Sequence, residues 1–256
     1  MKIWLALAKG VLLESLRRKD LWVVAILGFL IMTSAGALGF FGFEGLQAFA
    51  KDLAATVLGL FSTVIAIITT ARLMPDEIKN RTLYPLLARP IRRLDLLIGK
   101  LLGAVFVTWL SFLLLCVATG LALLVFRVQF EPIMAQYVLC KLLGLAVLCS
   151  VTFALSTIMT QAAAATVSFI FAFGSSMITR ALVLAHEANP TGAGIGFKLL
   201  NGILPQFGLF DLGGRAANMN WGPVPLWVIG FLFSYALLYS SAMLTISWLK
   251  FQRQAL

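Results

Sequence analysis

The sequence predicts an all-α, polytopic membrane protein with six transmembrane helices, and three observations support this fold class. Hydrophobic residues make up 61% of the chain and charged residues only 12%, whereas soluble domains are about 45–50% apolar and about 25% charged. The apolar residues form runs long enough to cross a bilayer, which takes about 20 residues per helix. A chain of 256 residues has room for roughly six such helices. We therefore expect residues 1–256 to form a single transmembrane domain with no separate soluble domain.

Residues 1–20 are typical of a helix that lies on the membrane surface. Five basic residues in this stretch surround an apolar face with the spacing i, i+4, i+8, i+9, which is formed by Ile3, Leu7, Val11 and Leu12. A cleaved signal peptide is the competing interpretation. The following apolar run, residues 21–43, is as long as a membrane span and has no convincing small-residue cleavage site. We therefore expect an N-terminal interfacial helix followed by the first span at 21–43.

The second and third spans are expected at about 53–73 and 96–126, on either side of a charged segment at 74–93. The third apolar run is longer than a membrane requires, so this helix should tilt or protrude.

Residues 142–179 contain no charged side chain, yet they are too long for one span. As a single helix they would measure roughly 57 Å, against a hydrocarbon core of about 30 Å. The stretch must therefore turn, and its only suitable polar cluster consists of Ser156, Thr157, Thr160 and Gln161. This places the fourth and fifth spans at 136–158 and 162–184.

A long loop rich in Gly, Asn and Pro follows at 186–222. Within it, residues 197–204 predict a short interfacial helix that ends at Pro205. The sixth span is expected at about 224–249.

The distribution of Lys and Arg predicts the orientation of the chain. If both termini lie on one side, that side carries thirteen basic residues outside the spans and the other side carries four. Basic residues are retained on the cytoplasmic side. Both termini and the 74–93 segment are therefore expected in the cytoplasm, and the 186–222 loop outside. This asymmetry accounts for the net charge of +10 without a nucleic-acid partner.

The 74–93 segment has the features of a short, stiff helix parallel to the membrane. Pro75 suits the first helical position, and Asp76 and Glu77 suit the first turn. Pro85 should kink or restart the helix, and Pro90 should end it. A helix of this kind could transmit force between a cytoplasmic protein and two spans. An ordinary basic loop that only fixes the topology fits the residues equally well.

The order of residues in this segment resembles a known family. Arg81-Thr82-Leu83, then Leu86-Leu87-Ala88-Arg89-Pro90 and later Gly99-Lys100 are similar to the inner-side segment of ABC-2-type permeases. The resemblance is to the six-span group named for multicopper-enzyme maturation, which includes the nitrous-oxide-reductase accessory permease. It departs from that pattern at Arg81, where the family often has Gly, and in the C-terminal basic pair, which is reduced to Arg253.

Two further matches extend the resemblance over nearly the whole chain. Residues 203–212 are similar to the Leu-Pro and Phe-Asp-Leu stretch that these permeases have before their last span. Tyr235-Ala-Leu-Leu-Tyr239 is similar to a motif within that span.

The resemblance implies the permease subunit of an ATP-binding-cassette exporter, spanning the cytoplasmic (inner) membrane several times. The chain would carry no catalytic site, because ATP and Mg²⁺ would bind to a separate ATPase subunit. A second copy or a sister permease would complete the pore. The cytoplasmic coupling helix between spans two and three would contact the ATPase through Asp76, Glu77, Arg81, Thr82, Leu83, Leu86 and Arg89.

By analogy with the same family, spans two and five would line the pore or the dimer interface. Their hydroxyl side chains are compatible with that role: Ser62, Thr63, Thr69, Thr70, Ser168, Ser175 and Ser176. Simple contact between helices explains these small residues equally well.

Other signals in the sequence have simpler interpretations. There is no Walker-type nucleotide loop, and the three cysteines lack metal-ligand spacing. His186-Glu187 cannot be a zinc-protease motif, because His186 is the only histidine. A charge within a membrane is a candidate for function, but Lys141 and Arg180 are expected instead to anchor the outer ends of their spans by extending toward the interface.

Three rival functions would require features of their own. The transmembrane coupling subunit of a vitamin importer would need two Ala-Arg-Gly-like helices, and the sequence offers one candidate segment without that motif. An intramembrane enzyme would need His, Asp, Glu or Cys side chains converging within the spans, which contain few of them. An ATP-independent channel is distinguished by the absence of an ATPase partner.

Overall fold

The computed structural model describes residues 2–17, 26, 46–79, 93–125, 131–188, 192–217 and 222–253. Within these ranges the chain is helical apart from short connections, and it contains no strand. The predicted first span at 21–43 lies outside the described residues except for residue 26. Residues 80–92 of the charged segment also lie outside them.

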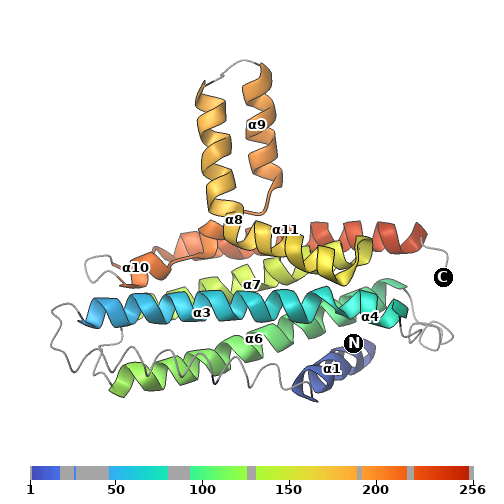
Figure 1. Ribbon diagram of the computed structural model, residues 1–256, viewed down its shortest axis with the longest axis horizontal. Coiled ribbons are helices and arrows are strands. Elements are labelled where there is room, and N and C mark those ends of the chain that lie inside the picture. Colours follow the sequence, from blue (N-terminus) through green and yellow to red (C-terminus); the bar gives the residue numbers. More distant parts are fainter. Residues whose placement is uncertain are drawn as a thin grey trace.

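The helices follow one another in the order shown in Figure 1. They are α1 (Lys2–Arg17), α3 (Leu46–Ala71), α4 (Leu73–Lys79), α6 (Arg93–Val125), α7 (Pro132–Ile158), α8 (Gln161–Ala188), α9 (Gly192–Ile203), the 3₁₀ helix η2 (Phe207–Phe210), α10 (Gly213–Ala217) and α11 (Leu226–Arg253).

Five of the described helices are long and apolar enough to cross a membrane: Ala50–Asp76, Leu94–Leu124, Pro132–Ile158, Gln161–Glu187 and Leu226–Gln252. They correspond to the second through sixth predicted spans. The four helices α3, α6, α7 and α11 run alongside one another, and both termini lie at the same end of this bundle as α4 (Figure 1). The described part of the chain thus has the character of a multi-pass membrane protein.

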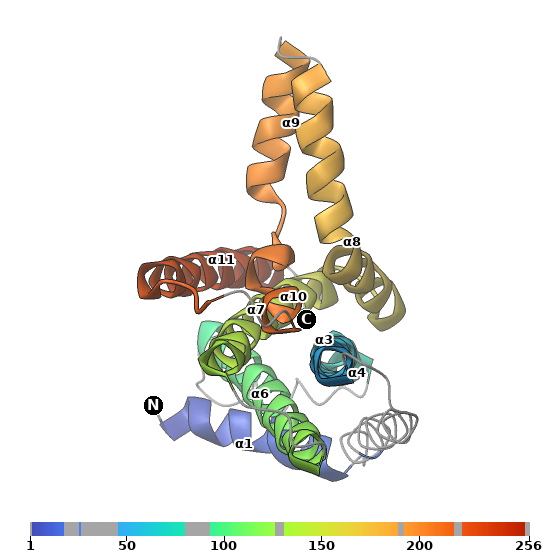
Figure 2. The same ribbon diagram turned by 90° about the vertical axis from the view of Figure 1, so that its left-hand side faces the viewer.

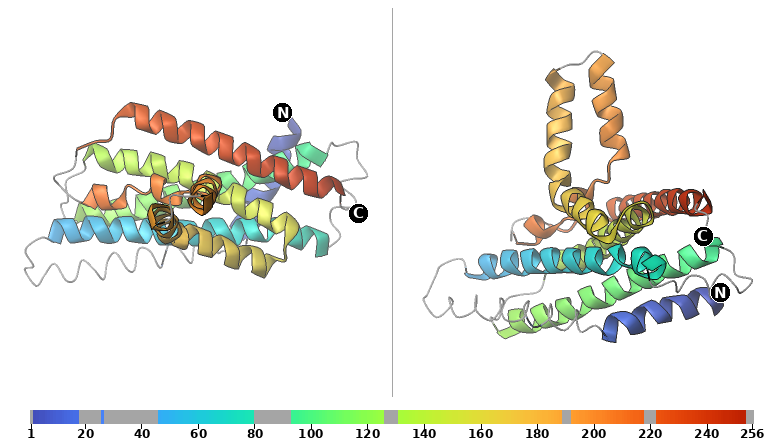
Figure 3. Two further views of the ribbon diagram at one scale, coloured as in Figure 1. Left: turned by 90° about the horizontal axis from the view of Figure 1, so that it is seen from above. Right: turned by 45° about the vertical axis from the view of Figure 1, so that its right-hand side comes forward.

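Helix α7 is the centre of the bundle, because it contacts α3, α6, α8 and α11. Phe153 and Cys149 on α7 are completely buried, as are Phe112 on α6 and Ile67 on α3. Viewed from above, α11, α7 and α3 run side by side (Figure 3).

Polar contacts fix α11 against α7 at two levels. The side chain of Gln136 exchanges two hydrogen bonds with the backbone of Val224, at 2.9 Å to its carbonyl oxygen and 2.7 Å from its amide. Further along, the hydroxyl of Ser150 donates to the hydroxyl of Ser240 at 2.9 Å. In an apolar bundle such paired polar groups fix the register of two helices, since leaving either group unpaired is unfavourable.

The chain turns between α7 and α8 at Met159 and Thr160, within the polar cluster that predicted a turn. Met159 is extended (φ −120°, ψ 168°), and its amide donates to the carbonyl of Leu155 at 2.9 Å, which closes the last turn of α7. The division of the uncharged stretch into two helices is confirmed.

Helix α8 differs from a simple straight span. Its first part follows the bundle, and its second part turns away and pairs with α9 as a hairpin that projects sideways (Figures 1 and 2). Helix α9 also begins five residues earlier than the predicted helix at 197–204. The hairpin exposes large apolar side chains, among them Met177 at 76% and Ile203 at 70%. A surface of this kind is suited to contact with lipid or protein rather than water.

Helix α1 packs against α6 instead of lying free of the bundle. Gly99 and Gly103 of α6, four residues apart, allow the two backbones to approach. A Cβ atom at Gly103 would lie 2.9 Å from Cβ of Val11 and 3.0 Å from Cα of Ala8. The apolar face predicted to rest on the membrane is therefore turned at least partly toward α6, since Val11 is buried there.

Candidate functional site

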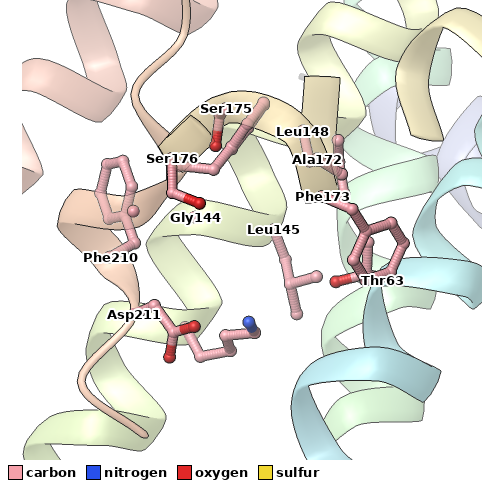
Figure 4. A pocket seen from close by; sticks show the side chains of 13 residues that line it. Thr63, Gly144, Leu145, Leu148, Ala172, Phe173, Ser175, Ser176, Phe210 and Asp211 are labelled. Carbon is pink, nitrogen blue, oxygen red and sulfur yellow. The ribbon is translucent and has the colours of Figure 1, made fainter. Parts of the chain in front are cut away.

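A polar chamber lies between α3, α7, α8 and the η2–α10 segment (Figure 4). It has two lobes of about 190 Å³ and about 400 Å³, which share Thr63, Lys141, Ala172, Phe173 and Asp211. The first lobe extends along α7 and α8 to Gly144, Ser175, Ser176 and Phe210. The second follows α3 to Asp52, Thr56 and Gly59.

The side chain of Lys141 lies inside this chamber, contrary to the expectation that it would anchor the outer end of a span. Lys141 lies nine residues into α7, which is about 14 Å along the helix. Its Nζ faces α3, at 3.4 Å from the Cβ that a side chain at Gly59 would have. A Cβ at residue 59 would be in ordinary van der Waals contact with the lysine. A basic side chain that faces the interior of a membrane bundle is a candidate for function.

Tyr137 lies beside Lys141, one turn earlier on α7. Its hydroxyl donates a hydrogen bond to the backbone carbonyl of Ala55 at 2.9 Å, which ties α7 to α3. Ala55 belongs to α3. In the same helix the Thr63 hydroxyl donates to the backbone carbonyl of Gly59 at 2.7 Å. The hydroxyls of Tyr137 and Thr63 are therefore engaged with the backbone of α3.

Asp211 brings a carboxylate to the chamber from the segment that follows η2. Its Oδ1 accepts a hydrogen bond from the amide of Gly213 at 3.0 Å, which orients the carboxylate at the start of α10. The charge of Asp211 acts on the Lys141 ammonium, but no direct ion pair joins the two in the described part of the chain. The chamber therefore holds separated charges of opposite sign.

The η2 segment is held in place by a close contact between Phe210 and Gly144. Phe210 is 2% exposed, and a Cβ at Gly144 would lie only 2.9 Å from Cβ of Phe210. On its other side the ring of Phe210 lies against Tyr235 of α11, with 5.9 Å between ring centroids. Only glycine at 144 lets η2 approach α7 closely enough to bring Asp211 into the chamber.

Two motifs that are separate in the sequence meet at this point. Tyr235 Oη accepts a hydrogen bond from the amide of Gln206 at 3.3 Å, and Tyr239 Oη donates to the carbonyl of Ile203 at 3.1 Å. The tyrosines of α11 therefore support the segment 203–212. This contact could not be predicted from either motif alone.

The structure divides the predicted pore or dimer residues into two groups. Thr63, Ser175 and Ser176 line the chamber. The other four are buried between helices and do not line it: Ser62, Thr69, Thr70 and Ser168. The Ser62 and Thr69 hydroxyls bond to backbone carbonyls of their own helix, at Leu58 and Ile65.

Four residues of the chamber were not predicted from the sequence as members of a site: Asp52, Lys141, Gly144 and Asp211. The available signal was Lys141, the one basic residue well inside the fourth predicted span. No group of three or more His, Cys, Asp or Glu side chains suited to a metal ion occurs within the described ranges.

The predicted ATPase contact is described only at its beginning. Asp76 lies in α4, while the side chain of Glu77 and all of Arg81, Thr82, Leu83, Leu86 and Arg89 lie outside what the structure describes. Helix α4 begins at Leu73, two residues before the predicted start at Pro75. Proline is tolerated there because the first amides of a helix need no intrahelical acceptor.

Helix α4 is anchored on the bundle by its first two residues. Leu73 and Met74 are buried in the main apolar core, Met74 to 1% exposure, and α4 contacts α7. The Asp76 amide donates to the carbonyl of Arg72 at 3.0 Å, across the junction with α3. The start of the charged segment is thus held firmly at the end of α3.

Comparison with known proteins gives one family assignment. A search of curated proteins finds no match. The model of a family described as "Protein of unknown function (DUF2705)" matches residues 13–255, which is nearly the whole chain. The protein therefore belongs to the DUF2705 family.

Proposed function

We propose that this protein is the transmembrane permease subunit of an ABC exporter in the cytoplasmic membrane. A separate ATPase subunit binds ATP and Mg²⁺ and docks on the segment 74–93, and this chain contributes no catalytic residue. A second copy or a sister permease completes the transporter. Both termini face the cytoplasm in this arrangement.

The observation that carries the proposal is the way residues 80–92 are attached. The segment leaves α4, whose Leu73 and Met74 are buried, and rejoins the bundle at α6, where Leu96 and Leu97 are buried. Both attachment points lie at the end of the bundle where the termini lie (Figure 1). A protein that binds this segment would therefore act on two helices through rigid junctions.

The same two helices connect the attachment points to the chamber. Helix α3 continues from α4 to Thr63, Gly59 and Asp52, which line the chamber, and α6 packs against both α3 and α7. Movement of the ATPase subunits would shift α3 relative to α7 as a rigid-body change. Nucleotide can drive this change only if the two arrangements bind the ATPase with different affinity.

The test is co-purification of the partner ATPase with the full-length tagged chain from its native membrane. A charge-reversal variant, E77K/R81E, and a deletion of residues 76–89 should lose the ATPase subunit, which mass spectrometry identifies by its Walker sequences. The matched control is R215E, a charge reversal on the exposed α10 at the opposite end. Size-exclusion chromatography in detergent establishes that each variant is folded. Unchanged assembly after the deletion would exclude the proposed docking role.

The chamber also suits an ATP-independent facilitator, because it offers a polar cavity within a membrane bundle. The same experiment separates the two functions. If the wild-type chain captures no Walker-containing subunit, yet moves solute in liposomes without ATP, the facilitator replaces the exporter.

A further inference from the structure

We infer that the polar chamber binds a zwitterionic group, in which an ammonium is close to a carboxylate or phosphate. This deepens the proposed function by naming a substrate class for the permease. The binding itself can be measured without the ATPase.

The Lys141 ammonium has three hydrogen-bond donors, and within the described ranges no side chain forms a hydrogen bond or a direct ion pair with it. The nearby Tyr137 hydroxyl is already engaged with the carbonyl of Ala55. A charge within a membrane bundle is unfavourable unless it is paired or solvated. The ammonium is therefore available to an anionic group that enters the chamber.

Two carboxylates line the other walls of the chamber. Asp211 uses Oδ1 for the amide of Gly213, which leaves Oδ2 for another donor. Asp52 of α3 lines the same lobe. A simple anion at Lys141 would be repelled by these two carboxylates, and a simple cation would leave Lys141 without a partner. A zwitterion satisfies both signs, with its anionic group at Lys141 and its ammonium toward Asp211 and Asp52.

The remaining lining of the chamber combines hydroxyl groups with aromatic rings. Thr63 and Phe173 lie on one side of the cavity, Ser175 and Ser176 above it, and Phe210 with Asp211 on the other side (Figure 4). The Ser175 and Ser176 hydroxyls can donate to the oxygens of an anionic group, and Phe173 and Phe207 offer apolar contact. The larger lobe, at about 400 Å³, lies within the range of about 300–1,000 Å³ typical of small-molecule sites.

Two sources could supply this chemistry: a free neutral amino acid, or the headgroup of phosphatidylethanolamine. Two probes distinguish them on the purified full-length chain. Equilibrium dialysis with an equimolar mixture of neutral L-amino acids detects a free solute. Native mass spectrometry from nanodiscs containing phosphatidylethanolamine or phosphatidylglycerol detects a retained lipid, and the second lipid is the anionic control.

The variants are chosen to change charge with little change in shape. K141M removes the ammonium, K141R retains a cation, and D211N retains the Oδ1 acceptor for Gly213 while removing the charge. R180M on α8 is the matched control, since Arg180 is an exposed cation that does not line the chamber. Circular dichroism and melting temperature report folding.

We expect one of the two zwitterions to bind the wild-type chain. Its affinity should be at least tenfold lower for K141M and for D211N, and it should be unchanged for R180M. K141R should recover part of the binding lost in K141M. If K141M is unfolded, D211N decides the result. Binding of neither zwitterion, equal retention of phosphatidylglycerol, or binding unaffected by both D211N and K141M would overturn the inference.

The outcome is separable from that of the proposed function. K141M should still co-purify with the ATPase subunit, because Lys141 belongs to α7 and not to the 74–93 segment. Zwitterion binding that depends on Lys141, in a chain that captures no ATPase, would leave the chamber assignment standing and exclude the exporter. Capture of the ATPase without zwitterion binding would support the exporter and exclude the chamber as a zwitterion site.

Discussion

Trp4 and Asp95, which are 91 positions apart in the chain, are joined by a hydrogen bond from Trp4 Nε1 to Asp95 Oδ1 at 3.0 Å. It connects the first turn of α1 to the first turn of α6. Because Asp95 lies next to the end of the 80–92 segment, this bond fixes α1 beside one of the two attachment points of that segment. Helix α1 therefore stabilises the start of α6, which under the proposed function would be moved by the ATPase subunit.

The first prediction concerns the hydrogen bond between Trp4 and Asp95. Trp4→Phe keeps an aromatic ring and removes the indole donor, so Asp95 loses a hydrogen bond worth about 1.5–3 kcal/mol for a charged acceptor. We expect a lower melting temperature of the detergent-solubilised protein and faster proteolysis within α1. Trp227→Phe is the control, because Trp227 is 75% exposed on α11. Equal melting temperatures for the two variants would show that the bond does not stabilise the protein.

The second prediction tests the close approach of α1 and α6. Gly103→Ala introduces a Cβ at 3.0 Å from the Ala8 backbone and 2.9 Å from Val11, so the helices must separate. We expect loss of stability and increased amide hydrogen exchange in α1.

Gly120→Ala on the same helix is the matched control, because nothing lies within 4 Å of the added Cβ. Its higher helix propensity should stabilise α6 by up to about 1 kcal/mol. If both alanine variants had the same effect on stability, the contact of α1 with Gly103 would be of no consequence.

The presence of the long helices was predictable from the sequence, because each long apolar run forms a helix and each polar break between runs ends one. The turn at Met159–Thr160 is one case, since a helix through it would exceed the membrane thickness. The direction of α8 after it leaves the bundle was not predictable. This helix is apolar on most of its surface, so its sequence does not define a face that must be buried.

The chamber was beyond prediction for a related reason. Hydropathy separates apolar from polar residues, but it does not distinguish a lipid-facing position from one that faces another helix. Lys141 was therefore assigned to the membrane interface, whereas its Nζ lies inside the bundle beside Gly59 of α3. The contribution of Asp211 depends on contacts of η2 with Gly144 and Tyr235, which are distant in the sequence.

The third prediction uses the ion pair between Lys51 and Glu131, whose Nζ and Oε1 are 2.5 Å apart. The Lys51 side chain is 1% exposed and that of Glu131 is 31% exposed. Glu131→Gln leaves a buried ammonium without its counter-charge, which is destabilising by up to about 3–5 kcal/mol. Lys51→Met leaves a carboxylate that water can reach, so its effect should be smaller.

The measured quantity is the difference in melting temperature between E131Q and K51M, obtained from thermal unfolding in detergent. The double variant K51M/E131Q should be more stable than E131Q, because no buried charge remains unpaired. Additive effects of the two substitutions would show that the side chains do not interact.

The fourth prediction concerns which end of the bundle faces the cytoplasm. A variant without native cysteines, C116A/C140A/C149A, provides the background for single cysteines at two exposed positions, Lys79→Cys on α4 and Gly214→Cys on α10. A maleimide that cannot cross membranes should modify the cysteine at 214 in intact cells and the cysteine at 79 only after permeabilisation. This follows from the excess of basic residues at the end that carries α4. Modification of the cysteine at 79 in intact cells would place the 74–93 segment beyond the reach of any cytoplasmic ATPase.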